Sequence, residues 1–496
     1  MKEKVLTRGA GILLPVASLP SDYGIGTLGN AAYSFIDLLV DLRQKYWQVL
    51  PIGPTSFGDS PYQSFSAFAG NPYLIDLGTL VKEGLLTGEE IAEYDWGGDE
   101  DDINYAALFE NRFRILQKAF GRFDRKEKEF RRFCEEKDGW LHEYSFFMAL
   151  KTFSGNREWL QWEPGLRNRD PVILKEYEDM LADQIVFWKF CQFKFFEQWG
   201  RLKKYANARG ILIIGDVPLY VALDSADVWA HRETFQLQED GTPEVVAGCP
   251  PDMFSESGQC WGNPIYEWDV MERDGFSWWR RRIAAITTLY DILRIDHFIG
   301  IIRYYAIPAE NLSGKGGRWV KGPGRKLMDV IEEAAKDRVV IAENLGISVP
   351  GAKKLMAKAG WPGLKVLLFA FDGNTANEHL PHNYTETGCV VYAGTHDNDT
   401  VVGHFRDNTE YELAFLYEYL GIHSKEEIPD ALIRLAYSSI ADVVIIQMQD
   451  ILKLGNEARM NLPSTVGENW RWRFKKDGLT EERRAWLRTL ATIYRR

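Results

Sequence analysis

Cysteine is scarce in this sequence of 496 residues. The five cysteines lie at positions 134, 191, 249, 260 and 389. They are too few and too scattered to form the disulfide framework of a small secreted protein, and without a C-x-x-C pair they lack the usual spacing of zinc ligands. We therefore expect thiols without disulfide bonds and no zinc site.

Long apolar runs and an excess of basic residues are also missing. No stretch approaches the ~20 consecutive apolar residues of a membrane span, and the start, MKEKVLTRGAG, has no apolar segment before a small-residue cleavage site. We expect a cytoplasmic protein that does not bind a membrane. The formal net charge of -12, without a basic tract, argues against a nucleic-acid partner and favours a neutral or polar ligand.

Aromatic residues, in contrast, are abundant, with 17 tryptophans, 22 tyrosines and 27 phenylalanines. Aromatic faces pack against sugar rings, but large cores also contain them, so carbohydrate is only one candidate ligand. The hydrophobic share of 45% and the charged share of 26% are ordinary for a globular protein. The length allows roughly two to four domains or one large barrel with insertions.

Short apolar runs rich in β-branched residues recur along the chain, with helical or irregular connections between them. This pattern predicts parallel strands that are buried on both faces of a sheet. The runs span residues 12–17, 47–52, 211–216, 292–297, 339–344, 366–371, 390–395 and 443–448. Eight strands joined by crossovers predict a (β/α)8 TIM barrel, whose active site lies at the C-terminal ends of the strands.

Two connections are too long for simple crossovers. Residues 78–200 are charged and aromatic with helical spacing, as in NRFRILQKAF, and predict a mainly helical insertion. Residues 218–290 include the Gly- and Pro-rich stretch EVVAGCPPDMFSESGQCWGNP and predict a loop-rich insertion. A long ordered loop over a barrel mouth is usually functional. We expect one catalytic barrel over residues 1–496 that includes both insertions.

The fourth predicted strand ends in an unusual group of polar residues, since DILRIDHF places Arg294, Asp296 and His297 almost side by side. A buried ion cluster contributes little net stability, so such a group at a strand end is more often chemical than architectural. The alternative is a structural salt bridge, because Arg294 and Asp296 lie on one face at positions i and i+2.

Other carboxylates also follow predicted strands: Asp216 the third, Glu343 the fifth, Asp372 the sixth and Asp397 the seventh. A barrel brings strand ends onto one rim, so Asp296 can meet Glu343 and Asp397 there. Carboxylates in one pocket push their pKa values apart, which suits an ionised nucleophile and a protonated acid. A retaining glycoside mechanism needs that pair roughly 5 Å apart.

Three simpler hypotheses compete with this interpretation. Glu343 could cap a helix, and Asp397 could form an Asx turn. A metal site is the third, because His297 and His396 adjoin acidic residues. Barrel metallohydrolases commonly take further histidine ligands from the first strand, where this chain has ILLPVAS, so we expect no metal.

Motifs along nearly the whole chain carry a family resemblance. They include RGAGILLPVASLP, SPYQSFSAFAGNPY, GDVPLYVA, DSADVWA, VVAGCPPD, GQCWGNPIY, RIDHF, AENLG, GTHDNDT and ARMNLPST. In combination they resemble the 4-alpha-glucanotransferases called amylomaltase or disproportionating enzyme, of the alpha-amylase clan. The resemblance implies a glycosyltransferase that needs no cofactor and acts on alpha-1,4-glucans and malto-oligosaccharides, with glucose as an acceptor.

The resemblance also implies roles for single residues. Asp296 would be the nucleophile, Glu343 the general acid/base and Asp397 the transition-state stabiliser, and Arg294 would keep the nucleophile ionised. On the donor side, His396 and Asp372 would bind sugar hydroxyls. Tyr62 would stack on the sugar, and Asp216 would support the pocket. The loop over the acceptor side would carry Asp252, Met253, Phe254, Gln259 and Trp261.

Some positions depart from the family pattern. Ile299 follows RIDHF where many relatives have Arg, Asn344 replaces a frequent Asp, Met253 stands where an aromatic residue is expected, and PSTVGENW differs from the usual late loop. Two other functions stay open: an alpha-glucan hydrolase with the same acids, and a glucan-binding barrel without catalysis. The sequence leaves the oligomeric state, the preferred chain length, the extent of cyclisation and the choice between maltose use and glycogen turnover undetermined.

Overall fold

The centre of the molecule is a parallel sheet of eight strands. The computed structural model describes residues 6–56, 58–251, 256–311, 313–347 and 349–496. The strand order is β10-β11-β12-β1-β2-β3-β6-β9, with parallel pairing throughout. The strands are β1 (Gly9–Leu13), β2 (Tyr46–Gln48), β3 (Leu212–Val217), β6 (Ile292–Ile295), β9 (Val339–Ala342), β10 (Gly363–Val366), β11 (Cys389–Tyr392) and β12 (Val443–Gln447).

The two outer strands, β9 and β10, meet and close the sheet into a barrel. The Ala342 N–H donates to the Pro362 carbonyl at 2.9 Å, and the Leu364 N–H donates to Oδ1 of Asn344 at 2.9 Å. A side-chain amide thus replaces a backbone acceptor at the seam. The predicted (β/α)8 barrel is confirmed.

Crossover helices surround the barrel, except between β10 and β11, where the chain forms the 3-10 turns η5 (Leu367–Phe369) and η6 (Pro381–Asn383). The helices of the other crossovers and of the C-terminal segment are α1 (Asn30–Asp41), α8 (Ala182–Ala208), α11 (Ser277–Leu289), α12 (Ile299–Ile302), α13 (Arg325–Ala335), α14 (Ala352–Ala359), α15 (Val401–Phe405), α16 (Glu410–Leu420), α17 (Ile428–Ser438), α18 (Met448–Ile451) and α19 (Glu481–Ile493). In the described residues no helix is long and apolar enough to cross a membrane.

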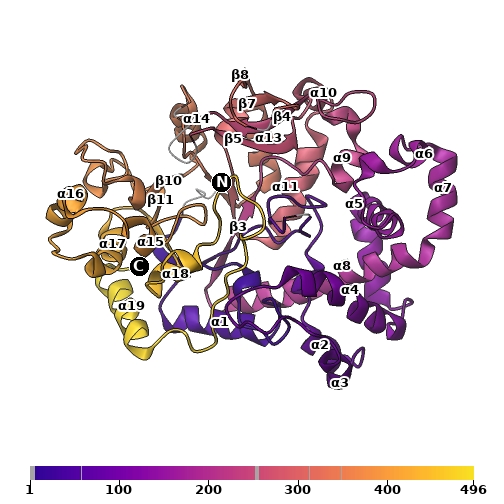
Figure 1. Ribbon diagram of the computed structural model, residues 1–496, viewed down its shortest axis with the longest axis horizontal. Helices are drawn as coiled ribbons and strands as arrows, with labels where there is room; N and C mark the ends of the chain where they lie inside the picture. Colours follow the sequence, from indigo (N-terminus) through magenta and orange to yellow (C-terminus); the bar gives the residue numbers. More distant parts are fainter. Residues whose placement is uncertain (1–5, 57, 252–255, 312, 348) are drawn as a thin grey trace.

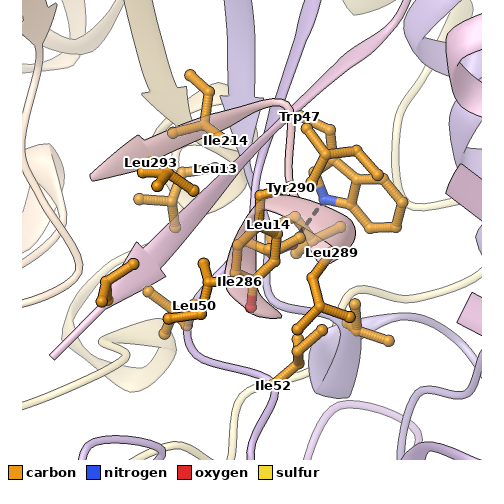
Figure 2. Packing of buried hydrophobic residues seen from close by; sticks show 14 of the residues in the cluster. Leu13, Leu14, Trp47, Leu50, Ile52, Ile214, Ile286, Leu289, Tyr290 and Leu293 are labelled. Carbon is orange, nitrogen blue, oxygen red and sulfur yellow. Dashed lines mark hydrogen bonds between the residues drawn. The ribbon is translucent and has the colours of Figure 1, made fainter. Parts of the chain in front are cut away.

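The strands form because their apolar runs are buried on both faces. Trp47 of β2 is fully buried in one hydrophobic cluster with Leu14 and Leu289 (Figure 2), and its ring lies 5.2 Å from that of Phe35 in α1, between centroids. Its indole N–H donates to the Leu14 carbonyl at 2.8 Å, so the one polar atom of the ring is satisfied. Truncation of a buried tryptophan typically costs roughly 3–5 kcal/mol, which makes this layer a main source of stability.

The order of the predicted strands is correct, but several of their boundaries are wrong. The first strand ends at Leu13, before the turn η1 (Val16–Ser18), and the sixth strand ends at Val366, before η5. In both places the apolar run continues because the turn after the strand is buried too. At these two turns the apolar residues show that the chain is buried, but they do not show where strand pairing ends.

The helices of residues 77–208 lie together on one side of the barrel, at the right of Figure 1. They are α2 (Leu77–Lys82), α3 (Gly88–Ala92), α4 (Tyr105–Arg122), α5 (Lys128–Phe153), α6 (Pro164–Arg167), α7 (Pro171–Met180) and α8. Aromatic pairs join α5 to α8, such as Trp140 with Phe196, whose ring centroids are 5.7 Å apart, and Tyr144 with Trp188 at 6.4 Å. Many of the abundant aromatic residues serve this packing.

Residues 218–290 contain more regular structure than expected. They form α9 (Ala226–Ala230), β4 (Val245–Cys249), β5 (Gln259–Pro264), α10 (Trp268–Arg273) and α11. Strands β4 and β5 join β7 (Arg303–Pro308) and β8 (Arg318–Lys321) in an antiparallel sheet of order β5-β4-β7-β8, seen at the top of Figure 1. The prediction of a loop-rich insertion did not include these strands, because Gly and Pro residues interrupt the alternation that would mark them.

Candidate active site

A cavity of about 560 Å³ opens at the C-terminal ends of the barrel strands. Its wall includes Asp296 after β6, Glu343 after β9, and Asp397 after β11. The small antiparallel sheet supplies another part of the wall through Gln259 and Trp261 of β5. The volume suits a ligand of several sugar-sized groups, and three carboxylates face it from different strands.

Arg294 joins two carboxylates beneath the cavity. Its Nη1 donates to both oxygens of Asp216, at 2.7 and 2.6 Å, and to Oδ1 of Asp296 at 2.9 Å. Asp216 and Arg294 are in register on β3 and β6, so sheet pairing sets their meeting. Burial raises the pKa of Asp216, and the attraction of Arg294 opposes that rise. Burial disfavours the charge of Arg294, but the two carboxylates raise its pKa well above the usual range.

Glu343 is held by backbone groups. Its Oε2 accepts from the His297 N–H at 2.9 Å, and its Oε1 accepts from the Leu345 N–H at 2.5 Å. His297 has a left-handed backbone, with φ of 49°. Burial raises the pKa of Glu343 to about 7, although Arg294 lowers it, while Asp296 adds to the rise. A carboxyl group with such a pKa can both donate and accept a proton near neutral pH.

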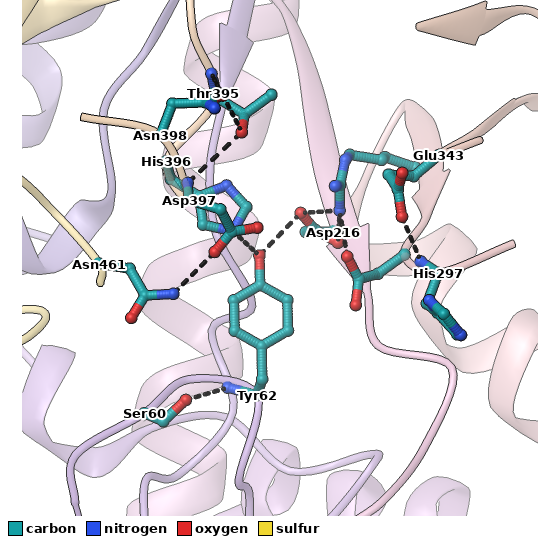
Figure 3. A network of polar contacts seen from close by, with 12 residues as sticks. Ser60, Tyr62, Asp216, His297, Glu343, Thr395, His396, Asp397, Asn398 and Asn461 are labelled. Carbon is teal, nitrogen blue, oxygen red and sulfur yellow. Dashed lines mark hydrogen bonds and ion pairs between the residues drawn. The ribbon is translucent and has the colours of Figure 1, made fainter. Parts of the chain in front are cut away.

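Asp397 is the most accessible of the three carboxylates, with 36% of its side chain exposed, against 23% for Asp296. Its Oδ1 accepts from Nδ2 of Asn461 at 2.7 Å, and its Oδ2 lies 3.3 Å from Nε2 of His396 (Figure 3). Both carboxylate oxygens are thus directed by neighbours. Asn461 lies in the motif ARMNLPST, and nothing in that motif by itself marks the residue as part of a site.

The Tyr62 side chain lies between Asp216 and His396, as Figure 3 shows. Its hydroxyl donates to Oδ2 of Asp216 at 3.1 Å and lies 2.8 Å from Nε2 of His396. The Tyr62 and His396 rings are stacked, with centroids 5.4 Å apart, and the Trp470 ring lies 5.8 Å from Tyr62. Trp470 lines the cavity as well, and sequence reasoning missed it.

Two of the predicted acceptor-side residues, Gln259 and Trp261, also line the cavity. Trp261 contacts the His297 ring edge to face, at 4.8 Å between centroids, and its indole N–H donates to Oε1 of Gln259 at 2.9 Å. Gln63 ties this strand to the loop of Tyr62, because its Nε2 donates to the Trp261 carbonyl at 3.1 Å. Phe254 lies outside the described residues, as do Asp252 and Met253.

The structure does not bring Asp372 together with the other predicted residues. It is exposed, it is not among the described residues that line the cavity, and its Oδ1 accepts from the Asn374 N–H at 2.9 Å in a turn. The physical reason is the early end of the sixth strand, since η5 separates Val366 from Asp372. Its predicted contact with the donor sugar stays a prediction.

The two histidines that suggested a metal site have other neighbours. His396 stacks on Tyr62, and burial lowers the pKa of His297 to about 4, which keeps it neutral beside Trp261. In the part of the chain that the structure describes, no group of three or more His, Cys, Asp or Glu residues could hold a metal ion. No disulfide joins the five cysteines.

A (β/α)8 barrel with carboxylates from separate strand ends around one cavity is typical of barrel enzymes that act on glycosidic bonds. The sequence profile of one such family, described as 4-alpha-glucanotransferase, matches residues 14–480. The chain belongs to this family, and the resemblance inferred from its motifs is confirmed.

Individual relatives agree with this assignment. The chain is 46% identical over 484 residues to the 4-alpha-glucanotransferase of Clostridium butyricum, covering 97% of this chain and 99% of the relative. It is 47% identical over 497 residues to that of Thermus thermophilus, covering 98% of each. A solved structure, amylomaltase from Streptococcus agalactiae in complex with acarbose, has a TM-score of 0.95 at 41% identity and covers 99% of each chain.

Proposed function

We propose that the protein is a retaining 4-alpha-glucanotransferase. It transfers a segment of an alpha-1,4-glucan to the 4-hydroxyl of glucose or of another alpha-glucan, without a cofactor. The observation that carries this proposal is the set of three carboxylates around one cavity, each in a different environment: Asp296 bonded to Arg294, Glu343 buried with a pKa raised to about 7, and Asp397 partly exposed.

In the first step, a carboxylate oxygen of Asp296 attacks the anomeric carbon of the donor. The bond from this carbon to the 4-oxygen of the next sugar breaks, and Glu343 gives its proton to that oxygen. Arg294 orients the nucleophile through Oδ1. The raised pKa of Glu343 keeps a large share of this group protonated at neutral pH, ready for the transfer.

In the second step, the 4-hydroxyl of an acceptor attacks the same carbon and releases Asp296. Glu343, now ionised, takes the proton of that hydroxyl, so the two steps return every group to its starting state. Two inversions give net retention of configuration. Asp397, directed by Asn461 and His396, stabilises the positive charge that develops on the sugar in both transition states.

The walls of the cavity divide into a donor side and an acceptor side. Tyr62 and His396 contact the donor sugar, and Asp216 supports them through its bond to the Tyr62 hydroxyl. Gln259 and Trp261 bind the acceptor, and an acceptor sugar stacked on the Trp261 ring displaces water from the intermediate. A similar role for Phe254 stays a prediction. The donor-side role of Asp372 stays a prediction too.

Donors are malto-oligosaccharides and longer alpha-1,4-glucans, and glucose is the smallest acceptor. The cytoplasmic location stays a prediction, as does the choice between maltose use and glycogen turnover. A potato relative, 41% identical, is described as chloroplastic/amyloplastic.

Incubation with maltotriose alone tests the proposal, with products separated by chain length. Transfer predicts glucose together with maltopentaose and longer glucans. Maltose and glucose without longer products would instead indicate an alpha-glucan hydrolase, and unchanged maltotriose would indicate a binding protein. The Asp296→Asn variant serves as the control, because any product that persists in it does not come from this site.

A further inference from the structure

Arg459 begins the late loop of residues 459–470, and its side chain contacts the loop after β11, which is distant in sequence. Its Nη2 donates to the Asp397 carbonyl at 3.0 Å, and its Nε donates to the Asn461 carbonyl at 2.8 Å. The third nitrogen, Nη1, lies 3.8 Å from Oδ2 of Asp399. One guanidinium group therefore contacts the strand-end loop after β11 and the late loop of residues 459–470.

The two carbonyls that Arg459 binds belong to the two residues whose side chains bind each other. Nδ2 of Asn461 donates to Oδ1 of Asp397 at 2.7 Å. The guanidinium is a rigid planar fork, so it fixes the distance between the two backbones and with it the geometry of the side-chain bond. Arg459 itself is not among the described residues that line the cavity, whereas Asp397 and Asn461 are.

The groups around Arg459 are anchored in turn. Asp399 is 11% exposed, and its side chain accepts from the Asn456 amide and from the Thr400 N–H, the latter at 2.7 Å. In the late loop, the Trp470 N–H donates to the Met460 carbonyl at 2.8 Å. The guanidinium therefore connects two supported loops, and its removal would release them from each other.

We propose that Arg459 is a positioning residue, which sets the Asp397 carboxylate through the Asp397 backbone and through Asn461. This inference rests on the proposed role of Asp397 in stabilising positive charge on the sugar. Because Arg459 is not part of the described cavity wall, its loss affects the transition state far more than substrate binding. A misplacement of about 1 Å can cost roughly 100-fold in rate, so we expect a 10- to 100-fold fall in kcat.

The first test compares Arg459→Met, Arg459→Lys and a matched control, Arg483→Met. Arg483 also binds a carbonyl and a carboxylate, those of Ile451 at 2.6 Å and Asp430 at 2.5 Å, but it does not line the cavity. We expect Arg459→Met to lower kcat while KM for maltotriose changes less than about threefold. Arg459→Lys recovers part of the rate, because an ammonium keeps the charge but not the fork.

The second test separates positioning from a structural role. In a Glu343→Gln background, which removes turnover, calorimetry measures binding of a protonated iminosugar and of neutral maltotriose. We expect Arg459→Met to weaken the iminosugar at least tenfold and to leave maltotriose within about threefold. The iminosugar carries the positive charge that a correctly placed Asp397 attracts.

Three outcomes would overturn the inference: unchanged iminosugar affinity in Arg459→Met, equal loss of both ligands, or a fall in rate that Arg483→Met matches. The Asp397→Asn variant in the same background distinguishes these from a failure of the proposed function. If Asp397→Asn itself leaves iminosugar affinity unchanged, the role of Asp397 is wrong. If only Arg459→Met leaves it unchanged, the role of Asp397 stands and the positioning by Arg459 is wrong.

Discussion

The raised pKa of Glu343 makes the free energy of unfolding depend on pH, and the Glu343→Gln substitution should remove this dependence. Burial raises this pKa from 4.5 to about 7. At about 1.4 kcal/mol for each pKa unit, ionising Glu343 in the folded protein costs roughly 3 kcal/mol more than in the unfolded chain. Glu343 therefore changes the free energy of unfolding by roughly 3 kcal/mol across the pH range. Because the folded-state pKa is the higher one, this contribution is fully present below about pH 4.5 and is lost as the pH rises through 7.

Glu343→Gln removes this titration. The amide also loses one acceptor for the N–H groups of His297 and Leu345, which costs roughly 1–3 kcal/mol, but at every pH. The difference in free energy of unfolding between the variant and the parent should therefore shift by about 2.5 kcal/mol in favour of the variant from pH 5 to pH 8.5. This shift is independent of the constant cost.

Denaturant unfolding of both proteins across this pH range measures the difference. Glu468→Gln is the control, because it makes the same chemical change at a side chain that is 91% exposed. A Glu343→Gln difference that stays constant from pH 5 to pH 8.5 would show that the pKa of Glu343 is not raised. The assignment of Glu343 as an acid at neutral pH would then lose its physical basis.

Three further outcomes are expected. The basic limb of kcat/KM should fall with an apparent pKa of about 7, and this limb should be absent from Glu343→Gln assayed with an activated glucosyl fluoride. Asp296→Asn should abolish transfer in a folded protein, and a residual rate within about tenfold of the parent, or roughly 1.4 kcal/mol of barrier, would remove Asp296 from the nucleophile role. Trp261→Ala and Phe254→Ala should raise the ratio of hydrolysis to transfer by about fivefold, if stacking on the ring contributes roughly 1 kcal/mol. Equal losses of both activities, measured by reducing-end release and by product length, would contradict the acceptor role.

The barrel could be predicted from the sequence because its strands are buried on both faces. Each strand is then a continuous apolar run, and the runs were found in the correct order. The sheet of β5, β4, β7 and β8 was missed for the opposite reason. Strand β5 has the sequence QCWGNP, which is partly exposed and contains Gly262 and Pro264, so it has neither a continuous run nor a clean alternation.

The candidate site was predictable where a residue directly follows its strand. Asp296 and Glu343 do so, and they line the cavity. Asp372 does not, because the buried turn η5 extends the apolar run beyond the end of pairing. Asn461 has no such positional mark, since its bond to Asp397 spans 64 residues and depends on how a late irregular loop folds back over the barrel.

The division of roles between Asp296 and Glu343 is the central claim, and trapping the intermediate tests it most directly. Glu343→Gln is incubated with an activated glucosyl fluoride, whose leaving group departs with little protonation, and its peptides are analysed by mass spectrometry. The account predicts a glucosyl adduct that accumulates on Asp296, because the acceptor lacks its base. No adduct, or an adduct on another residue, would contradict it.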